Sequence, residues 1–159
     1  MGGWTGFFET AAGASATLVG LLVVAISINL ARILGFAQLP SRAGSALIPL
    51  AGVMVISMLA LVPQALRTFG IEVLCAGVVI WAWAGYLLVQ SLRLTENLKP
   101  EWVISHVPLN QAQTLPLIVA GALLALGFPS GLYWIVAGMI ASMLAALLNA
   151  WVLMVEILR

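Results

Sequence analysis

Apolar residues run along the chain in five long stretches, separated by short segments rich in polar residues, glycine or proline. The stretches cover about residues 10–34, 45–66, 71–92, 111–128 and 132–158. An α-helix rises about 1.5 Å per residue, so about 20 apolar residues cross the hydrocarbon core of a bilayer. The pattern predicts an all-α, polytopic membrane helix bundle with about five transmembrane helices, forming a single transmembrane domain over residues 1–159.

The fourth stretch is the shortest, because only residues 115–128 are continuously apolar. The charge pattern nevertheless favours a crossing. With five spans, one side of the membrane holds five basic residues and the other only Arg67; the five are Arg32, Arg42, Arg93, Lys99 and Arg159. Without the fourth crossing, the split falls to four against two. Since basic loops stay in the cytoplasm, we expect the N-terminus outside and the C-terminus inside, with residues 94–110 as a cytoplasmic loop.

Composition excludes several classes of protein. The chain is 64% hydrophobic and 7% charged, with a formal net charge of +1 and a mean hydropathy of +1.18. A soluble domain carries about 25% charged residues, so we expect no soluble domain here. A nucleic-acid-binding surface needs a basic patch, which this chain lacks, so we expect no nucleic-acid partner. The first eight residues contain no Lys or Arg, unlike the start of a signal peptide, so we expect the first stretch to stay attached as a helix.

Small residues spaced by four predict where helices pack closely within lipid. One such ridge on the last stretch comprises Gly138, Ser142, Ala146 and Ala150, and another on the first comprises Ala12, Ala16 and Gly20. The tryptophans Trp81 and Trp83 fall in the middle of the third stretch, and we interpret them as packing residues whose indole N–H groups need partners. A small bundle with such ridges also predicts a homo-oligomer.

Polar residues within the spans are the candidates for function, because each one in a bilayer needs a partner, water or a role. Pore-lining candidates are Ser57 and Gln64 on the second stretch and Ser142 and Asn149 on the last. A second set lies toward the cytoplasmic boundary and forms an inner polar cluster: Asn29, Arg32, Arg93 and Glu156. This cluster is open to two interpretations, as an anchor for helix ends or as an inner vestibule.

Two prolines make the second stretch irregular. Pro49 and Pro63 lack a backbone N–H, so a continuous helix there leaves the carbonyl groups of Ser45 and Leu59 without their usual partners. We expect helix kinks at these positions. A kink that exposes backbone carbonyl groups suits a gate, but prolines are also ordinary in membrane helices.

Catalytic chemistry is not indicated by the sequence. The chain contains no Asp, one His at position 106 and one Cys at position 75, which leaves no multi-cysteine or paired-histidine metal site. Ser15 lies in the outer half of the first span, whereas His106 belongs to the cytoplasmic loop, so the two cannot form a nucleophile and base pair. We therefore predict that the protein is not an enzyme and needs no cofactor or metal.

Two segments carry a resemblance to other proteins. Residues 15–22, SATLVGLL, and residues 149–156, NAWVLMVE, resemble segments of small bacterial integral membrane proteins of comparable length that have no assigned activity. The resemblance implies a location in the bacterial inner membrane and no particular reaction or ligand.

Two functional hypotheses follow. The first is an oligomeric channel or channel-like passive transporter for ions or small solutes, because polar groups and proline positions occur together without catalytic residues. The alternative is a non-transporting accessory protein that binds another membrane protein or a lipid. Its docking element is then the segment 99–107, which mixes Trp102 and other apolar residues with charged ones along the inner membrane surface.

Overall fold

The structure is a computed structural model that describes the backbone of residues 2–35, 39–93 and 100–158 and the side chains of residues 3–31, 33–35, 40, 43–87, 89 and 111–151. Within these residues it is entirely helical. A short 3₁₀ turn, η1 (Gly2–Trp4), and a short helix, α2 (Leu30–Leu34), accompany five long helices. The long helices are α1 (Thr5–Ile28), α3 (Leu39–Leu61), α4 (Leu66–Arg93), α5 (Pro100–Ala125) and α6 (Gly131–Leu158).

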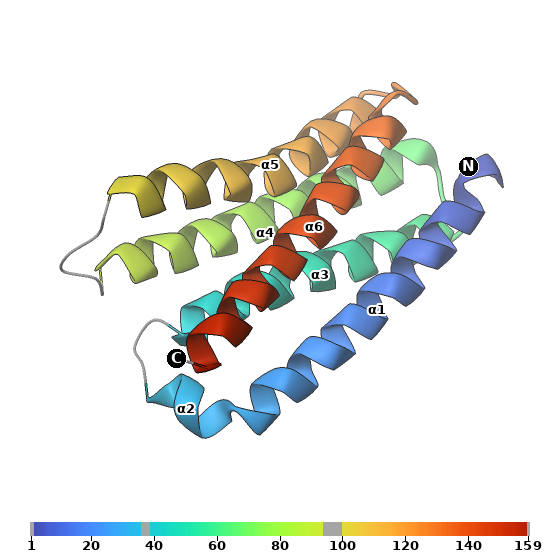
Figure 1. Cartoon of the computed structure of the whole chain (residues 1–159). Coiled ribbons are helices and arrows are strands. Elements are labelled where there is room, and N and C mark those ends of the chain that lie inside the picture. The colour runs from blue at the N-terminus through green and yellow to red at the C-terminus, as the bar shows by residue number, and fades with distance from the viewer. Residues whose placement is uncertain (1, 36–38, 94–99, 159) are drawn as a thin grey trace.

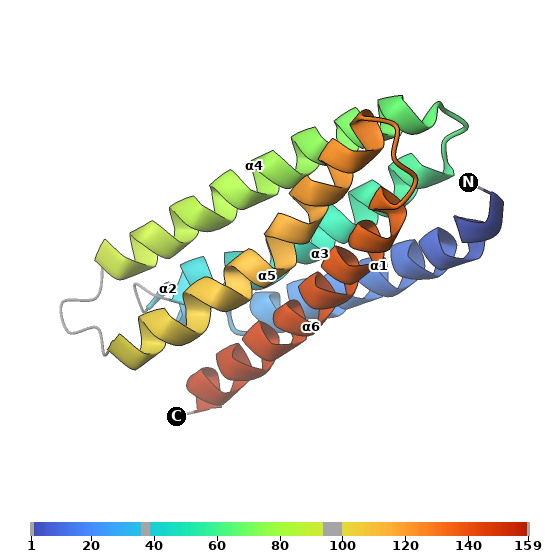
Figure 2. The same ribbon diagram turned by 90° about the horizontal axis from the view of Figure 1, so that it is seen from above.

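The five long helices pack side by side as one bundle (Figure 1). Helix α3 is central and contacts α1, α4 and α6, whereas α5 packs against α4 and α6. Helix α1 lies at the edge and packs along α3 (Figure 2). The start of α1 and the end of α6 lie at opposite ends, here called the N-terminal and C-terminal ends of the bundle.

Four of the described helical segments are long and apolar enough to cross a membrane: Thr5–Ile28, Ala43–Leu61, Leu66–Leu87 and Gly131–Trp151. They define the chain as a multi-pass helical membrane protein. The apolar part of α5, Gln111–Ala125, is shorter. A complete crossing by α5 stays a prediction from the charge pattern, as does the side of the membrane that each terminus faces.

Several helix boundaries differ from those predicted. Helix α5 begins at Pro100, so residues 100–110, predicted as a loop, are helical. Proline suits the first position of a helix, where its missing N–H leaves no bond unmade. The first predicted span, residues 10–34, is divided: α1 ends at Ile28, and Asn29 separates it from α2. Helix α4 starts at Leu66 rather than at residue 71 and continues through Gly70.

Glycines bring α4 and α5 into backbone contact. A Cβ atom placed at Gly70 would overlap the backbone of Leu124 and Ala125, lying 2.6 Å from the Leu124 carbonyl carbon. One placed at Gly121 would lie 2.6 Å from the Cα of Leu74. Only glycine permits this approach in lipid, where packing contacts and interhelical hydrogen bonds replace the hydrophobic effect between helices.

The predicted small-residue ridge on the last helix lies inside the bundle. Gly138 is buried against Leu117 of α5, and Ser142 and Ala146 are also buried. The predicted ridge on the first helix is different, because Ala16 and Gly20 are exposed and nothing lies within 4 Å of a Cβ placed at Gly20. Helix α1 instead turns Phe8, Ala11, Ser15 and Leu22 toward the bundle.

The turn between α5 and α6 is set by local sequence. Gly127 has a φ of 91°, the N–H of Phe128 bonds the carbonyl of Leu123 at 2.9 Å, and the N–H of Gly127 bonds that of Leu124 at 2.9 Å. This is the Schellman arrangement that ends a helix with glycine in a left-handed conformation. Pro129 and Ser130 then lead into α6, so α5 and α6 form a helical hairpin.

Aromatic rings fasten the N-terminal end of the bundle. Trp4 meets Tyr133 of α6 edge to face at a centroid distance of 5.2 Å, and Phe8 meets Phe69 of α4 at 6.2 Å. Phe8 and Phe69 are 1% and 0% exposed, so this cluster closes the core between three helices. Edge-to-face geometry aligns the positive ring edge with the negative face of its neighbour.

Candidate functional site

The pore-lining candidates Ser57 and Ser142 are both buried between helices of this chain. The Ser142 hydroxyl on α6 donates a hydrogen bond of 3.3 Å to the carbonyl of Gln113 on α5. Ser57 is 0% exposed, and its hydroxyl has no hydrogen-bond partner among the described residues. Ser142 therefore joins two helices, while Ser57 sits within the α3 packing surface.

Gln64 closes the end of α3. Pro63 has no N–H to offer the carbonyl of Leu59, and that carbonyl instead accepts bonds from the N–H of Val62 at 3.2 Å and from Nε2 of Gln64 at 3.0 Å. The same Nε2 donates to Oε2 of Glu72 on α4 at 2.7 Å. Gln64 thus caps one helix and ties it to the next.

Replacing Gln64 with leucine is expected to lower the free energy of unfolding by about 1 kcal/mol, because the partly buried Leu59 carbonyl and Glu72 carboxylate lose their shared donor. Denaturation in mixed micelles, followed by circular dichroism, measures this change. Thr68→Val, at an exposed position of the same end, is the control and leaves stability unchanged. Equal stability of the two variants would contradict the capping role.

The two predicted kinks have different outcomes. Pro49 lies within α3 and is buried. Pro63 lies beyond Leu61, where α3 has already ended, so it terminates the helix and does not kink it. Pro63 has no N–H to continue the helical hydrogen-bond pattern. The Leu59 carbonyl therefore accepts its bonds from the Val62 N–H and from the Gln64 side chain.

The inner polar cluster is described only in part. Asn29 is half-buried, and its Nδ2 donates to the carbonyl of Ala25 at 2.9 Å, where α1 ends. Arg32 is on α2, Arg93 ends α4 and Glu156 is near the end of α6, but their side chains lie outside the described residues. The side chains of the predicted dock, residues 99–107, also lie outside them. The last pore candidate, Asn149, is half-buried on α6.

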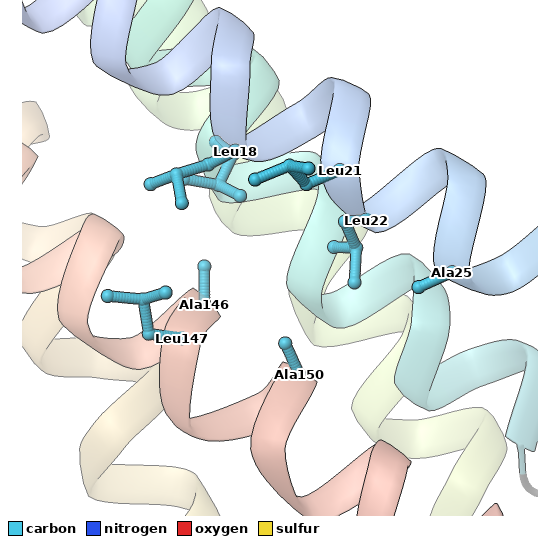
Figure 3. A pocket seen from close by; sticks show the side chains of 8 residues that line it. Leu18, Leu21, Leu22, Ala25, Ala146, Leu147 and Ala150 are labelled. Atoms are coloured by element: carbon cyan, nitrogen blue, oxygen red, sulfur yellow. The ribbon is translucent and has the colours of Figure 1, made fainter.

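A hollow that sequence reasoning missed lies between α1 and α6, above α3. It has a volume of about 180 Å³, and the described side chains that line it are all leucine or alanine (Figure 3). The lining residues are Leu18, Leu21, Leu22 and Ala25 of α1, Leu50 of α3, and Ala146, Leu147 and Ala150 of α6. No pattern in the sequence distinguishes these leucines from the many others, and we call this hollow the α1–α6 groove.

The exposed side of α1, opposite its buried residues, carries small residues from Gly6 to Gly20. We call this the small face of α1: Gly6, Thr10, Gly13, Thr17 and Gly20. Nothing lies within 4 Å of a Cβ placed at any of its three glycines. The hydroxyls of Thr10 and Thr17 each donate to the carbonyl four residues earlier at 2.8 Å, so the face leaves no side-chain donor unused. The alternating spacing of four and three residues is visible in the sequence and could have revealed it.

The opposite edge of the bundle has a different surface. Trp81 and Trp83 of α4 are 43% and 57% exposed, which corrects their interpretation as residues buried between helices. The indole N–H of Trp81 donates to Oε1 of Gln111 on α5 at 3.0 Å. This bond satisfies the indole at a bilayer-facing position and links two neighbouring helices.

Neither metal chemistry nor similarity supplies an activity. Among the described side chains, no group of three or more His, Cys, Asp or Glu residues is placed to hold a metal ion. No family model matches the chain, and no curated protein or solved structure matches it.

Proposed function

We propose that the protein is a non-transporting accessory protein of the bacterial inner membrane that associates, through the small face of α1, with another transmembrane helix. This proposal is based on one observation: the other helices of the chain cover α1 only in part. Only α3 packs along its length, and 17% of the residues in its apolar window are buried, against 44% for the corresponding windows of α3 and α6.

The residues on the small face suit a helix better than they suit lipid. Glycine costs about 1 kcal/mol relative to alanine within a helix, and Gly6, Gly13 and Gly20 gain no compensating contact within this chain. A second helix that approaches closely would supply backbone packing contacts at these positions. Exposed positions of α6 carry large side chains such as Tyr133, Leu144 and Trp151, which offer lipid more contact area than glycine does.

The polar residues first considered for a channel support the accessory role as well. Ser142 donates its hydrogen bond to α5, and Gln64 donates to α4 and to the end of α3. The groove is lined by aliphatic side chains, which offer an ion or hydrated solute no ligands. The channel hypothesis stays a prediction, and it requires a polar route formed by assembly of several copies.

Cysteine cross-linking in native membranes tests the association. In a Cys75→Ser background, Gly13→Cys and Thr17→Cys are expected to form covalent adducts with a thiol-to-photoreactive linker, whereas Ala137→Cys, exposed on α6, is the control and is expected to form none. Mass spectrometry of the adduct identifies the partner helix as another membrane protein or as a second copy. Equal labelling at all three positions would refute a specific interface.

Reconstitution into liposomes separates the two hypotheses. We expect ion and small-solute flux no greater than in protein-free liposomes, across gradients and applied voltages. Flux that Ser142→Leu abolishes while the fold persists would overturn the accessory role and favour the channel.

A further inference from the structure

The α1–α6 groove has the size of a single hydrocarbon chain segment. An apolar cavity of about 150 Å³ accepts a guest as large as benzene. The groove, at about 180 Å³, therefore accepts a short run of methylene groups. A helix, about 10 Å across, is too wide for it.

The groove is partly open, and the alanines on α1 and α6 leave space that longer side chains would fill. Ala25 of α1 lies across from Ala150 of α6 (Figure 3), and Leu50 of α3 also lines the groove. Helices α1 and α6 come close to each other at few places along their length, which leaves this hollow between their described side chains. Among the described side chains, the lining contains no charged or polar group, which favours an alkyl guest over water.

Basic residues lie where the groove approaches the C-terminal end of the bundle. Arg32 is on α2, the short helix that follows the end of α1 at Ile28, and Ala25 lies in the last turn of α1. Arg42 lies in the first turns of α3 at the same end. The helix ends that flank this part of the groove carry these two arginines against the single carboxylate Glu156. The excess of positive charge complements a phosphate headgroup.

We propose that the α1–α6 groove holds one acyl chain of an anionic phospholipid, with its headgroup at the C-terminal end of the bundle near Arg32 and Arg42. The proposal does not rest on the association through the small face, because the groove lies on a different side of α1. An acyl chain in the groove covers part of the C-terminal half of α1 that the other helices of this chain leave exposed.

Native mass spectrometry of the full-length protein tests the acyl-chain site, with phosphatidylglycerol and phosphatidylcholine of identical chains as probes. Ala150→Phe and Ala25→Phe fill the groove from opposite walls, and either is expected to reduce bound phosphatidylglycerol about tenfold by displacing the chain. Ala137→Phe, at an exposed position of α6, is the matched control and keeps the lipid. Two groove variants that both fold, shown by circular dichroism, and bind lipid like the control would overturn the proposal.

The same spectra test the headgroup and the rival occupant. The wild type is expected to bind phosphatidylglycerol about tenfold better than phosphatidylcholine, and the double substitution Arg32→Gln with Arg42→Gln is expected to remove this preference. Equal binding of the two lipids by the wild type would overturn the anionic headgroup. A dimer peak that disappears in Ala150→Phe, without any bound lipid, would show that a second copy occupies the groove and would overturn the lipid site.

Discussion

Gly70→Ala is expected to lower the free energy of unfolding of the bundle by about 3 kcal/mol, because the added methyl group has no space. It would overlap the α5 backbone at Leu124 and Ala125, which cannot move aside as a flexible side chain can. The two helices must separate along their closest contact, and the packing at Gly121 and Leu74 loosens with it. Unfolding in mixed micelles, followed by tryptophan fluorescence, measures the loss.

Gly85→Ala is the matched control for this substitution. Gly85 is on the same helix, and nothing lies within 4 Å of a Cβ placed there, so the methyl group meets open space. Alanine has the higher helix propensity, and the control is expected to equal or slightly exceed the wild type in stability. If both variants lost the same stability, the close contact between α4 and α5 would not explain the effect.

The sequence predicts the elements whose determinants are local. The turn between α5 and α6 needs a glycine with positive φ, and Gly127 supplies it two residues before Pro129. The start of α5 is harder to predict, because apolar length reports which residues suit lipid and not which residues are helical. Residues 100–110 are too polar to extend the apolar run, yet they continue the helix from Pro100.

The candidate site was predicted less well, because depth along a helix does not reveal which neighbour a side chain meets. Ser142 was correctly placed on a small-residue ridge, but its bond to the Gln113 carbonyl depends on the register between α5 and α6. Gln64 was assigned to a helix face, although Pro63 had ended that helix before it. Hydrogen bonding to Leu59 and Glu72 follows from that ending.

The placement of α1 shows the same limit. Small residues occur on more than one side of this helix. The sequence alone favoured Ala12, Ala16 and Gly20 as the packing ridge and not the residues of the small face. The structure buries Phe8 and Ser15 instead, because the large ring fills the space beside Phe69. A bulky aromatic side chain outweighed a small-residue ridge, which left the glycines exposed.

Phe8→Ala is therefore expected to release the N-terminal end of α1 and lower the free energy of unfolding by about 3 kcal/mol. Phe8 is 1% exposed and packs against the ring of Phe69 at 6.2 Å, so alanine leaves a cavity between α1 and α4. Phe128→Ala removes an equal ring that is 56% exposed and is expected to change stability by less than about 0.5 kcal/mol. Mixed-micelle unfolding of both variants compares the losses, and faster hydrogen exchange confined to the start of α1 would locate the release. Similar losses for the two variants would mean that the ring cluster does not hold α1 against the bundle.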